Sequence, residues 1–201
     1  RGPLGKMLPN GARVAEHYAS VPYADIPALF AALRAKGGRT ATALAFVLLT
    51  AVRSGELRLA TWREFDLQAK TWTIPGSRTK TGAEHVVPLS DEAIALLPET
   101  GRLDDLVFRG LTRLRPMSDA TLLKALRKVR GDNSTVHVLR ASFRTWAADK
   151  TDYAHEVAEA ALGHRVGDDV VRAYQRGTFF EKRRELMNDW ARFATTPVRS
   201  Q

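Results

Sequence analysis

The sequence contains no cysteine among its 201 residues. Disulfide frameworks, thiolate nucleophiles and zinc–thiolate sites are therefore all excluded. The sequence also lacks a long apolar run: the longest, at about residues 41–52, is too short to span a bilayer and is interrupted by threonine. That run predicts a buried helix, and we expect no membrane partner.

Acidic residues are outnumbered by basic ones. The chain has 31 lysines and arginines against 22 aspartates and glutamates, which gives a formal net charge of +9. Basic side chains on one surface displace counterions from phosphate groups, so this balance favours a polyanionic partner. A basic surface that is only solvated fits the charge equally well. The share of hydrophobic residues, 44%, is typical of a globular protein.

Apolar residues at helical spacing predict three helices in the first third of the chain. The first carries Ile26, Leu29, Phe30 and Leu33 along one face and ends at Gly37-Gly38. The second covers residues 40–51, and a short third helix covers about residues 54–60. Residues 1–20 lack this periodicity and contain glycine and proline, so they predict an extended arm or linker.

The pattern then changes to short β-favouring runs. These runs contain Trp72, Ile74, Val86, Val87 and Leu89, and a turn-rich stretch, "GSRTKTGA", separates them. They predict a small antiparallel sheet with Lys80 near the tip of its hairpin. The fold class we expect is therefore α+β: mainly α-helical, with a small three-stranded antiparallel sheet. A Ser-Asp cap signal starts a short helix at "SDEAIALLP".

From Ser118 onward the pattern is helical, with breaks predicted at residues 131–134, at 163–167 and at Gly177. The last helix, about residues 179–193, places apolar side chains along one stripe: Phe179, Leu186, Met187, Trp190 and Phe193. That helix either closes the core of its own chain or packs against a neighbouring copy. Trp62, Trp72 and Trp146 are predicted core residues.

One predicted helix of this half has a wholly basic outer face. Lys124, Arg127 and Lys128 fall together on it, opposite a leucine-rich face. Such a face favours contact with a phosphate backbone. A helix that is only solvated would more usually mix charges of both signs.

Five short stretches carry basic or nucleophilic side chains: "LLTAVRSGEL", "SRTKTG", "VHVLRASFRTW", "LGH" and "RAYQR". Each motif alone is common. In these stretches the candidate residues are, in order, Arg53 and Glu56, Lys80, His137 and Arg140, His164, and Tyr174.

In this order and spacing the motifs resemble the tyrosine recombinase family, most closely the integrases of phages and genomic islands. The resemblance covers nearly the whole chain after about residue 20. It implies the integrase-like catalytic core at residues 21–195, followed by a tail at 196–201, with the family's N-terminal DNA-binding domains absent from this chain. The sequence departs from the family in "TAVR" and at Val138-Leu139, where many relatives carry a glycine.

The resemblance assigns chemistry to three kinds of side chain. A phosphodiester gains negative charge on its non-bridging oxygens under attack, and two guanidiniums, Arg53 and Arg140, match the family's clamps for that charge. Tyr174 matches the nucleophile, which forms a covalent phosphotyrosine. Lys80 matches the general acid that protonates the departing 5′ oxygen.

The remaining residues are given supporting roles. His137 helps to deprotonate the phenol, and His164 donates a hydrogen bond to the phosphate. Glu56 orients side chains beside the first arginine. No metal or other cofactor is implied, and the adjacent acidic pairs Asp104-Asp105 and Asp168-Asp169 diverge instead of converging on one point.

The implied function is site-specific recombination of double-stranded DNA at attachment sites, for integration or excision of a mobile element. The implied assembly is a tetramer on DNA and a monomer free in solution, in the bacterial cytoplasm and associated with the nucleoid when bound to DNA. Two alternatives stay open: a topoisomerase-like enzyme that relaxes DNA by the same chemistry, and a non-catalytic DNA-binding remnant.

Each candidate residue also has a plain structural interpretation when taken alone. Arg53 could pair with Glu56 at the surface, Lys80 could be solvated, and Tyr174 could pack its ring in a helix. Tyr153 is the second candidate nucleophile, although it lacks the "LGH" register. The other histidines, His17, His85 and His155, have no matching role and are predicted to be structural or surface residues.

Overall fold

The computed structural model describes residues 21–110, 115–164 and 169–197, and the side chains of residues 169–178 are outside that description. Two helices open the fold: α1 (Ile26–Lys36) and α2 (Gly38–Thr50). Only Gly37 separates them, with φ of +64°, a left-handed conformation that glycine adopts without a steric penalty. The prediction that the first helix ends at this glycine pair is confirmed.

Helix α2 lies at the centre of the fold and packs against α1, α5 (Asp119–Arg130) and α8 (Asp169–Ala194). Most of its side chains are buried, including Leu44, Phe46 and Leu48. The apolar run that is too short for a membrane span is therefore a core helix, as predicted. Among the residues that the structure describes, no helix is both long enough and apolar enough to cross a membrane.

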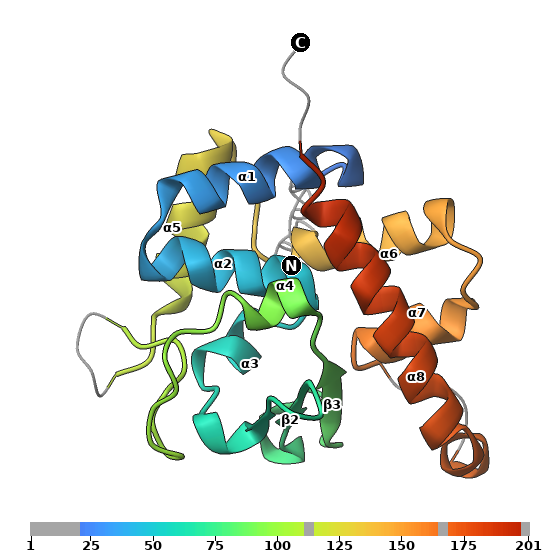
Figure 1. Ribbon diagram of the computed structural model, residues 1–201. Helices are drawn as coiled ribbons and strands as arrows, with labels where there is room; N and C mark the ends of the chain where they lie inside the picture. Colours follow the sequence, from blue (N-terminus) through green and yellow to red (C-terminus); the bar gives the residue numbers. More distant parts are fainter. Residues whose placement is uncertain (1–20, 111–114, 165–168, 198–201) are drawn as a thin grey trace, which may run out of the picture.

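The sheet lies at one end of the molecule (Figure 1). Its three antiparallel strands are β1 (Phe65–Asp66), β2 (Thr71–Ile74) and β3 (His85–Pro88), in the order β1-β2-β3. Trp72 pairs with Val87 and is fully buried, so one face of the hairpin rests on the core. The predicted fold class and the small three-stranded antiparallel sheet are confirmed.

Short helices connect these parts. Helix α3 (Ser54–Arg58) follows α2, and α4 (Asp91–Ile94) follows the sheet, with the Ser90 side chain accepting a hydrogen bond from the Ala93 amide as the cap signal predicts. Single 3₁₀ turns are present at η1 (Tyr23–Asp25), η2 (Trp62–Glu64) and η3 (Gly76–Arg78).

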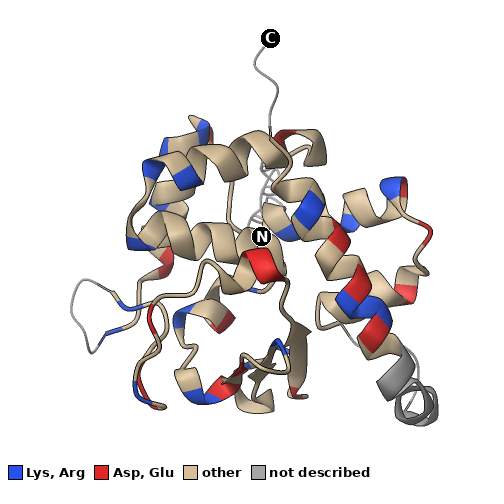
Figure 2. Cartoon of the chain, viewed as in Figure 1, with Lys and Arg blue, Asp and Glu red and all other residues tan. Residues whose placement is uncertain are grey.

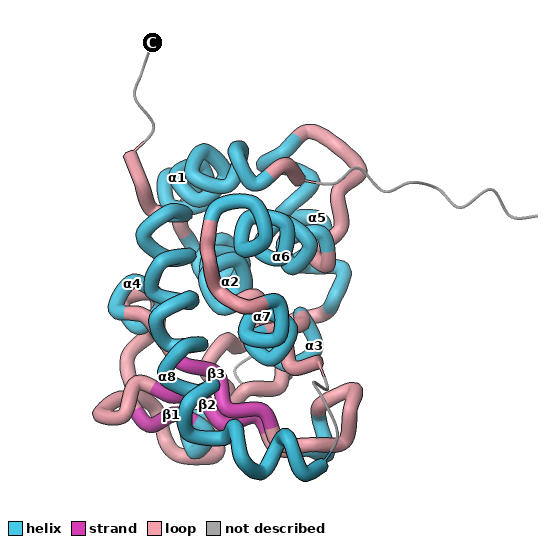
Figure 3. Tube along the Cα trace, turned by 90° about the vertical axis from the view of Figure 1, so that its right-hand side faces the viewer, coloured by secondary structure: helices cyan, strands magenta, loops and turns pink. Residues whose placement is uncertain are grey.

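The C-terminal helices α6 (Val138–Lys150), α7 (His155–Ala161) and α8 stand beside this body, and α8 passes along β3 (Figures 1 and 3). The predicted apolar stripe is confirmed: Leu186, Met187 and Trp190 are buried, and the Trp190 indole N–H donates to the Leu48 carbonyl at 2.8 Å. This end of α8 therefore closes the core of its own chain.

Two predictions about helix ends are wrong. The predicted break at Gly177 is absent, because α8 runs from Asp169 to Ala194 without interruption. Glycine in a helix interior costs only about 1 kcal/mol, which is too little by itself to end a helix. A break that the pattern does not show lies between α6 and α7. There Thr151 is extended and its hydroxyl donates to the Ala147 carbonyl, ending α6.

Candidate active site

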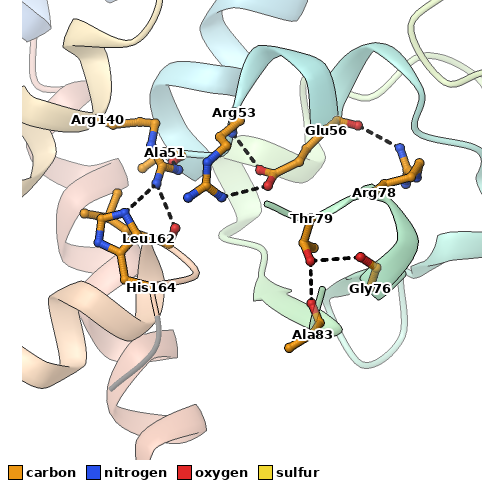
Figure 4. Close-up of polar contacts among 10 residues, drawn as sticks. All are labelled: Ala51, Arg53, Glu56, Gly76, Arg78, Thr79, Ala83, Arg140, Leu162 and His164. Carbon is orange, nitrogen blue, oxygen red and sulfur yellow. Dashed lines mark hydrogen bonds and ion pairs between the residues drawn. The ribbon is translucent and has the colours of Figure 1, made fainter. Parts of the chain in front are cut away.

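A cleft of about 500 Å³ lies between α3, the turn of the β2–β3 hairpin and the start of α6. The predicted residues that line it are Arg53, Glu56, Lys80, His137 and Arg140. They come from segments that are up to 87 positions apart in the chain, from Arg53 to Arg140. The fold therefore brings five candidate residues to one opening (Figure 4 shows three of them).

Arg53 stands at the start of α3 and is held by the buried carboxylate of Glu56. The carboxylate accepts one hydrogen bond from the Arg53 amide at 2.8 Å and another from its guanidinium at 2.9 Å. Glu56 is 3% exposed, whereas the Arg53 side chain is 23% exposed. Glu56 thus fixes the direction of Arg53 and leaves part of the guanidinium open to the cleft.

Arg140 is buried more deeply and is held mainly by backbone oxygens. Its guanidinium donates to the carbonyls of Ala51, at 2.5 Å, and Leu162, at 2.8 Å, and lies 3.3 Å from His164 Nε2 (Figure 4). Burial and the charge of Arg53 lower the pKa of Arg140 to about 10, so it still carries its charge at neutral pH. Arg140 joins the end of α2 to the turn after α7.

Ala51 presents its carbonyl to Arg140 from an unusual backbone conformation. It has φ of +52° and ψ of +23°, in the left-handed region, at the end of α2. A non-glycine residue pays about 1–2 kcal/mol there. This is the alanine of "TAVR", and a glycine at this position would take the same conformation without that cost.

Lys80 is presented by a compact turn at the tip of the β2–β3 hairpin, as predicted. The Thr79 hydroxyl bonds to the carbonyls of Ala83 and Gly76, at 2.7 and 3.1 Å (Figure 4). A Cβ on Gly76 would lie 2.5 Å from the Gly82 carbonyl oxygen, so the turn closes on a glycine. The Lys80 side chain is exposed beside the cleft.

The base of this turn is tied to the first arginine motif. Arg78 donates to the Glu56 carbonyl at 3.0 Å and forms an ion pair with Glu64. Glu64 also accepts from the Trp72 indole at 2.9 Å. Movement of the Lys80 turn relative to Arg53 is restricted by these contacts.

The two candidate histidines differ in their surroundings. His137 precedes α6 and its side chain is exposed on the cleft side. Partial loss of solvent around the ring, followed by the charges of Arg140 and Arg53, lowers its pKa. A lowered pKa keeps the ring neutral, and so able to accept a proton, further into the acid range. His164 lies after α7, with Nδ1 2.6 Å from the Glu159 carboxylate.

The turn that carries His164 is shaped by Gly163 and His85. Gly163 has φ of +67°, and a Cβ at this position would lie 3.2 Å from the His85 ring. His85 is 9% exposed, and burial, followed by the charges of Arg183 and Arg140, lowers its pKa to about 3. His85 is therefore a buried neutral ring that packs under the turn, which agrees with its predicted structural role.

Tyr174 lies in α8, but its side chain is outside the described residues, as are residues 165–168 with Asp168. The helix itself is anchored nearby. Arg183 donates to the carbonyls of Val86 in β3, at 3.0 Å, and Ala160 in α7, at 3.4 Å. Strand β3 is part of the Lys80 hairpin, and α7 leads into the turn with His164. Arg183 therefore fixes the position of α8 relative to both.

The second candidate nucleophile, Tyr153, is engaged elsewhere. Its hydroxyl donates to Asp189 Oδ2 at 3.0 Å. Burial and this hydrogen bond raise the pKa of Tyr153 to about 12, which disfavours the phenolate that attacks phosphorus. Tyr153 is not among the residues that line the cleft.

The basic face of α5 is less uniform than the sequence pattern indicates. Lys124 and Lys128 are exposed, whereas Arg127 is half-buried and donates to the Ser134 carbonyl at 3.3 Å. Arg127 therefore holds the loop after α5. Lysine and arginine are frequent along α5 and at the C-terminal end of α1 (Figure 2).

Sequence reasoning missed three residues that build the site: Glu159, Arg183 and Arg78. Glu159 and Arg183 are charged residues in ordinary helical patterns, and no local signal marks them; Arg78 lies in the stretch "SRTKTG", but the resemblance assigns it no role. Among the described residues, no group of three or more histidine, aspartate or glutamate side chains converges as a metal site requires.

Comparison with known proteins adds three findings. The sequence model of the phage integrase family matches residues 21–179. The prophage integrase IntZ of Escherichia coli (strain K12) is 33% identical over 185 residues, covering 90% of this chain and 46% of that protein. The chain spans about half the length of the relatives that it matches.

Two solved structures share the fold. The integrase from mycobacterium phage Brujita superimposes with a TM-score of 0.65 at 18% identity, covering all of this chain and 63% of that one. A lambda integrase tetramer bound to a Holliday junction gives a TM-score of 0.55 at 20% identity, covering 79% of this chain and 51% of that one.

Proposed function

Because the chain belongs to the phage integrase family, we propose that it is the catalytic part of a site-specific DNA recombinase. It cleaves and rejoins double-stranded DNA at attachment sites through a 3′-phosphotyrosine, for integration or excision of a mobile element. The observation that carries this proposal is the cleft in which two guanidiniums, a lysine and a histidine meet.

The chemistry follows from the charge that develops at the scissile phosphate. The oxygen of Tyr174 attacks phosphorus and gives up its proton to His137, which is exposed and has a lowered pKa. Arg53 and Arg140 stabilise the charge on the non-bridging oxygens. The bond to the 5′ oxygen breaks, and Lys80 supplies the proton that this oxygen takes as it leaves. Rejoining runs through the same steps in reverse.

The role of Lys80 is tested by changing the leaving group. Lys80→Ala is expected to slow cleavage of an ordinary duplex by about 10²–10⁴-fold, because the 5′ alkoxide then leaves without a proton. A duplex with a bridging sulfur at the 5′ position should restore the rate, since a thiolate needs no proton. Gel assays of the cleaved strand measure both.

The control is Lys70→Ala, which removes another exposed lysine of the same sheet region, one that pairs with Asp91. Lys70→Ala should leave cleavage of both substrates unchanged. If the sulfur substrate fails to rescue Lys80→Ala, Lys80 is not the general acid.

We propose that the DNA backbone extends from the cleft across α5. The carboxylate of Asp119, the first residue of α5, accepts from the Ser54 hydroxyl at 3.2 Å, so the start of α5 adjoins the cleft. The double variant Lys124→Ala/Lys128→Ala is expected to weaken binding to all duplexes. It should also reduce the slope of log K against log salt by about 0.9 for each lysine that contacts a phosphate.

Binding titrations from low to moderate salt measure this slope. The matched control replaces two exposed lysines away from this face, Lys70 and Lys182, and should leave the slope unchanged. An unchanged slope in the α5 variant would show that Lys124 and Lys128 are only solvated and contact no phosphate.

We further propose that the active assembly is a tetramer on DNA, as in the lambda integrase structure, whose tetramer is bound to a Holliday junction. Two duplexes of different length that carry the attachment sequence should then yield products with exchanged ends. Relaxation of supercoiled plasmid without exchanged ends would instead favour the topoisomerase-like alternative.

A further inference from the structure

Arg183 is a half-buried cation of α8 that, unlike its neighbour Arg184, pairs with no carboxylate among the described residues. Its guanidinium donates instead to the carbonyls of Val86, at 3.0 Å, and Ala160, at 3.4 Å, and lies 5.3 Å from the centre of the Phe180 ring. Burial lowers its pKa to about 10, so the charge is kept at neutral pH. Its hydrogen bonds are thus made to the main chain of other elements, whose positions it can fix.

The two carbonyls belong to elements that lead into the candidate site. Val86 lies in β3, an outer strand of the sheet and one arm of the β2–β3 hairpin. Ala160 lies in the last turn of α7, and its carbonyl also accepts from the Gly163 amide at 3.1 Å, in the turn that leads to His164. A cation is favourable beside the last carbonyls of a helix, which have no partner within the helix. One nitrogen of Arg183, Nη1, therefore joins α8 to both elements.

Arg183 also lies close to Tyr174 along the helix. Positions 174 and 183 are nine residues apart in one uninterrupted helix, which is about 13 Å along its axis. Two further side chains of α8 bond to other elements, and both follow Arg183 in the chain: Arg184 and Trp190. Among the side chains that the structure describes, the hydrogen bonds of Arg183 to other elements are therefore the nearest to Tyr174.

We propose that Arg183 is a positioning residue: by binding β3 and α7 it aligns Tyr174 with the phosphate that the cleft holds. The inference rests on the proposed function, which takes Tyr174 to be the nucleophile. A tilt of α8 by about 5° at Arg183 would move a residue that lies about 13 Å away by about 1 Å. A misplacement of about 1 Å costs about 10²-fold in rate. Arg183 needs no contact with DNA for this role.

The neighbouring arginine anchors α8 without touching these elements. Arg184 donates to the carbonyls of Ala69, at 3.2 Å, and Lys70, at 3.5 Å, between β1 and β2. Its guanidinium lies 4.9 Å from the centre of the same Phe180 ring. Arg184 therefore binds α8 to the same sheet through similar contacts, but at a turn that carries no candidate site residue. It is the matched control for Arg183.

The rate of cleavage, measured apart from DNA binding, tests the inference. Arg183→Met removes the charge and the hydrogen bonds but keeps an unbranched apolar side chain. Single-turnover cleavage of an attachment-site duplex at saturating protein should slow by about 10²-fold, whereas the Kd for that duplex should stay near that of the unaltered chain. Arg184→Met should leave both values unchanged. If Arg184→Met slows cleavage as much as Arg183→Met, loss of any anchor of α8 is sufficient and the proposal fails.

A conservative variant separates positioning from folding. Denaturant unfolding identifies a temperature at which every variant is folded, and rates are compared there. Arg183→Lys keeps the charge on a shorter side chain, so it should cleave faster than Arg183→Met and more slowly than the unaltered chain. Equal rates in the two variants would overturn the proposal. If Arg183→Met does not fold, Arg183→Lys is compared with the unaltered chain alone, and an unchanged rate overturns the proposal.

The duplex with a bridging sulfur shows which partner of the reaction Arg183 aligns. The turn that presents Lys80 stays tied to the first arginine motif through Arg78, which donates to the Glu56 carbonyl. Proton transfer to the leaving oxygen should therefore be intact in Arg183→Met, and the sulfur should not restore its rate. Rescue by sulfur would mean that Arg183 acts through Lys80, and it would overturn the assignment to Tyr174.

The same assays separate this inference from the proposed function. If the unaltered chain forms no covalent adduct with the duplex, the recombinase proposal fails and the inference fails with it. If the unaltered chain cleaves the duplex and a folded Arg183→Met cleaves it equally fast, only the inference fails.

Discussion

Tyr174→Phe is expected to abolish covalent capture of a nicked duplex, a loss of about 10⁴-fold or more, while DNA binding stays near normal. The phenol oxygen is the only atom removed, and in the proposed reaction it forms the bond to phosphorus. The basic residues that bind the phosphate, Arg53 and Arg140, are untouched. Gel shift under denaturing conditions measures capture, and a native binding titration measures affinity.

The matched control is Tyr153→Phe, which removes the same atom from the second candidate nucleophile. Its hydroxyl is bound to Asp189, and its pKa is raised to about 12, so capture should be unchanged. Some loss of stability, about 1 kcal/mol, is expected because the hydrogen bond to Asp189 is lost. Capture retained in Tyr174→Phe would refute Tyr174 as the nucleophile. Capture lost only in Tyr153→Phe would identify Tyr153 as the nucleophile.

Arg140→Ala is expected to reduce both cleavage and stability. The substitution removes a charge that stabilises the transition state, for a loss in cleavage of about 10²–10³-fold. It also leaves the buried carbonyls of Ala51 and Leu162 without their donor. Each unsatisfied buried acceptor costs about 1–3 kcal/mol, so the loss of both donors should lower the free energy of unfolding by about 2–6 kcal/mol. Denaturant unfolding and single-turnover cleavage measure the two effects.

Arg63→Ala is the control for losing an arginine. Arg63 pairs with Asp104, and both side chains are more than half exposed. Such surface pairs contribute about 0–1 kcal/mol, so stability should change little and cleavage not at all. If Arg140→Ala unfolds at the same denaturant concentration as the unaltered chain, the guanidinium does not hold the α2 end and the α7 turn together.

Local patterns predicted much of the fold because those elements obey local rules. Helices α1 and α2 follow from apolar spacing and the Gly37-Gly38 stop, and the hairpin follows from β-favouring runs around a turn-rich stretch. The uninterrupted α8 did not follow, since one glycine in a helix interior costs only about 1 kcal/mol and does not have to end a helix. At the break after α6, Thr151 is extended and its hydroxyl donates to the Ala147 carbonyl, a contact that apolar spacing does not predict.

The candidate site divides in the same way. Arg53, Lys80, His137, Arg140 and His164 were assigned from a resemblance in motif order, and the structure places the first four around one cleft and bonds His164 to Arg140. The contacts that hold these side chains could not be predicted, because most of them are hydrogen bonds to backbone carbonyls or to residues far away in the sequence. Glu159 and Arg183 act through atoms that no sequence motif marks.

The central claim is that one phosphate is attacked by Tyr174 among these cationic groups. Its most direct test is to trap the unaltered chain on a nicked duplex that carries candidate attachment-site DNA, digest the adduct and identify the modified peptide by mass spectrometry. The account predicts a nucleotide joined through its 3′-phosphate to the oxygen of Tyr174. An adduct on Tyr153 or on any other residue would contradict it, as would cleavage of the duplex without a covalent intermediate.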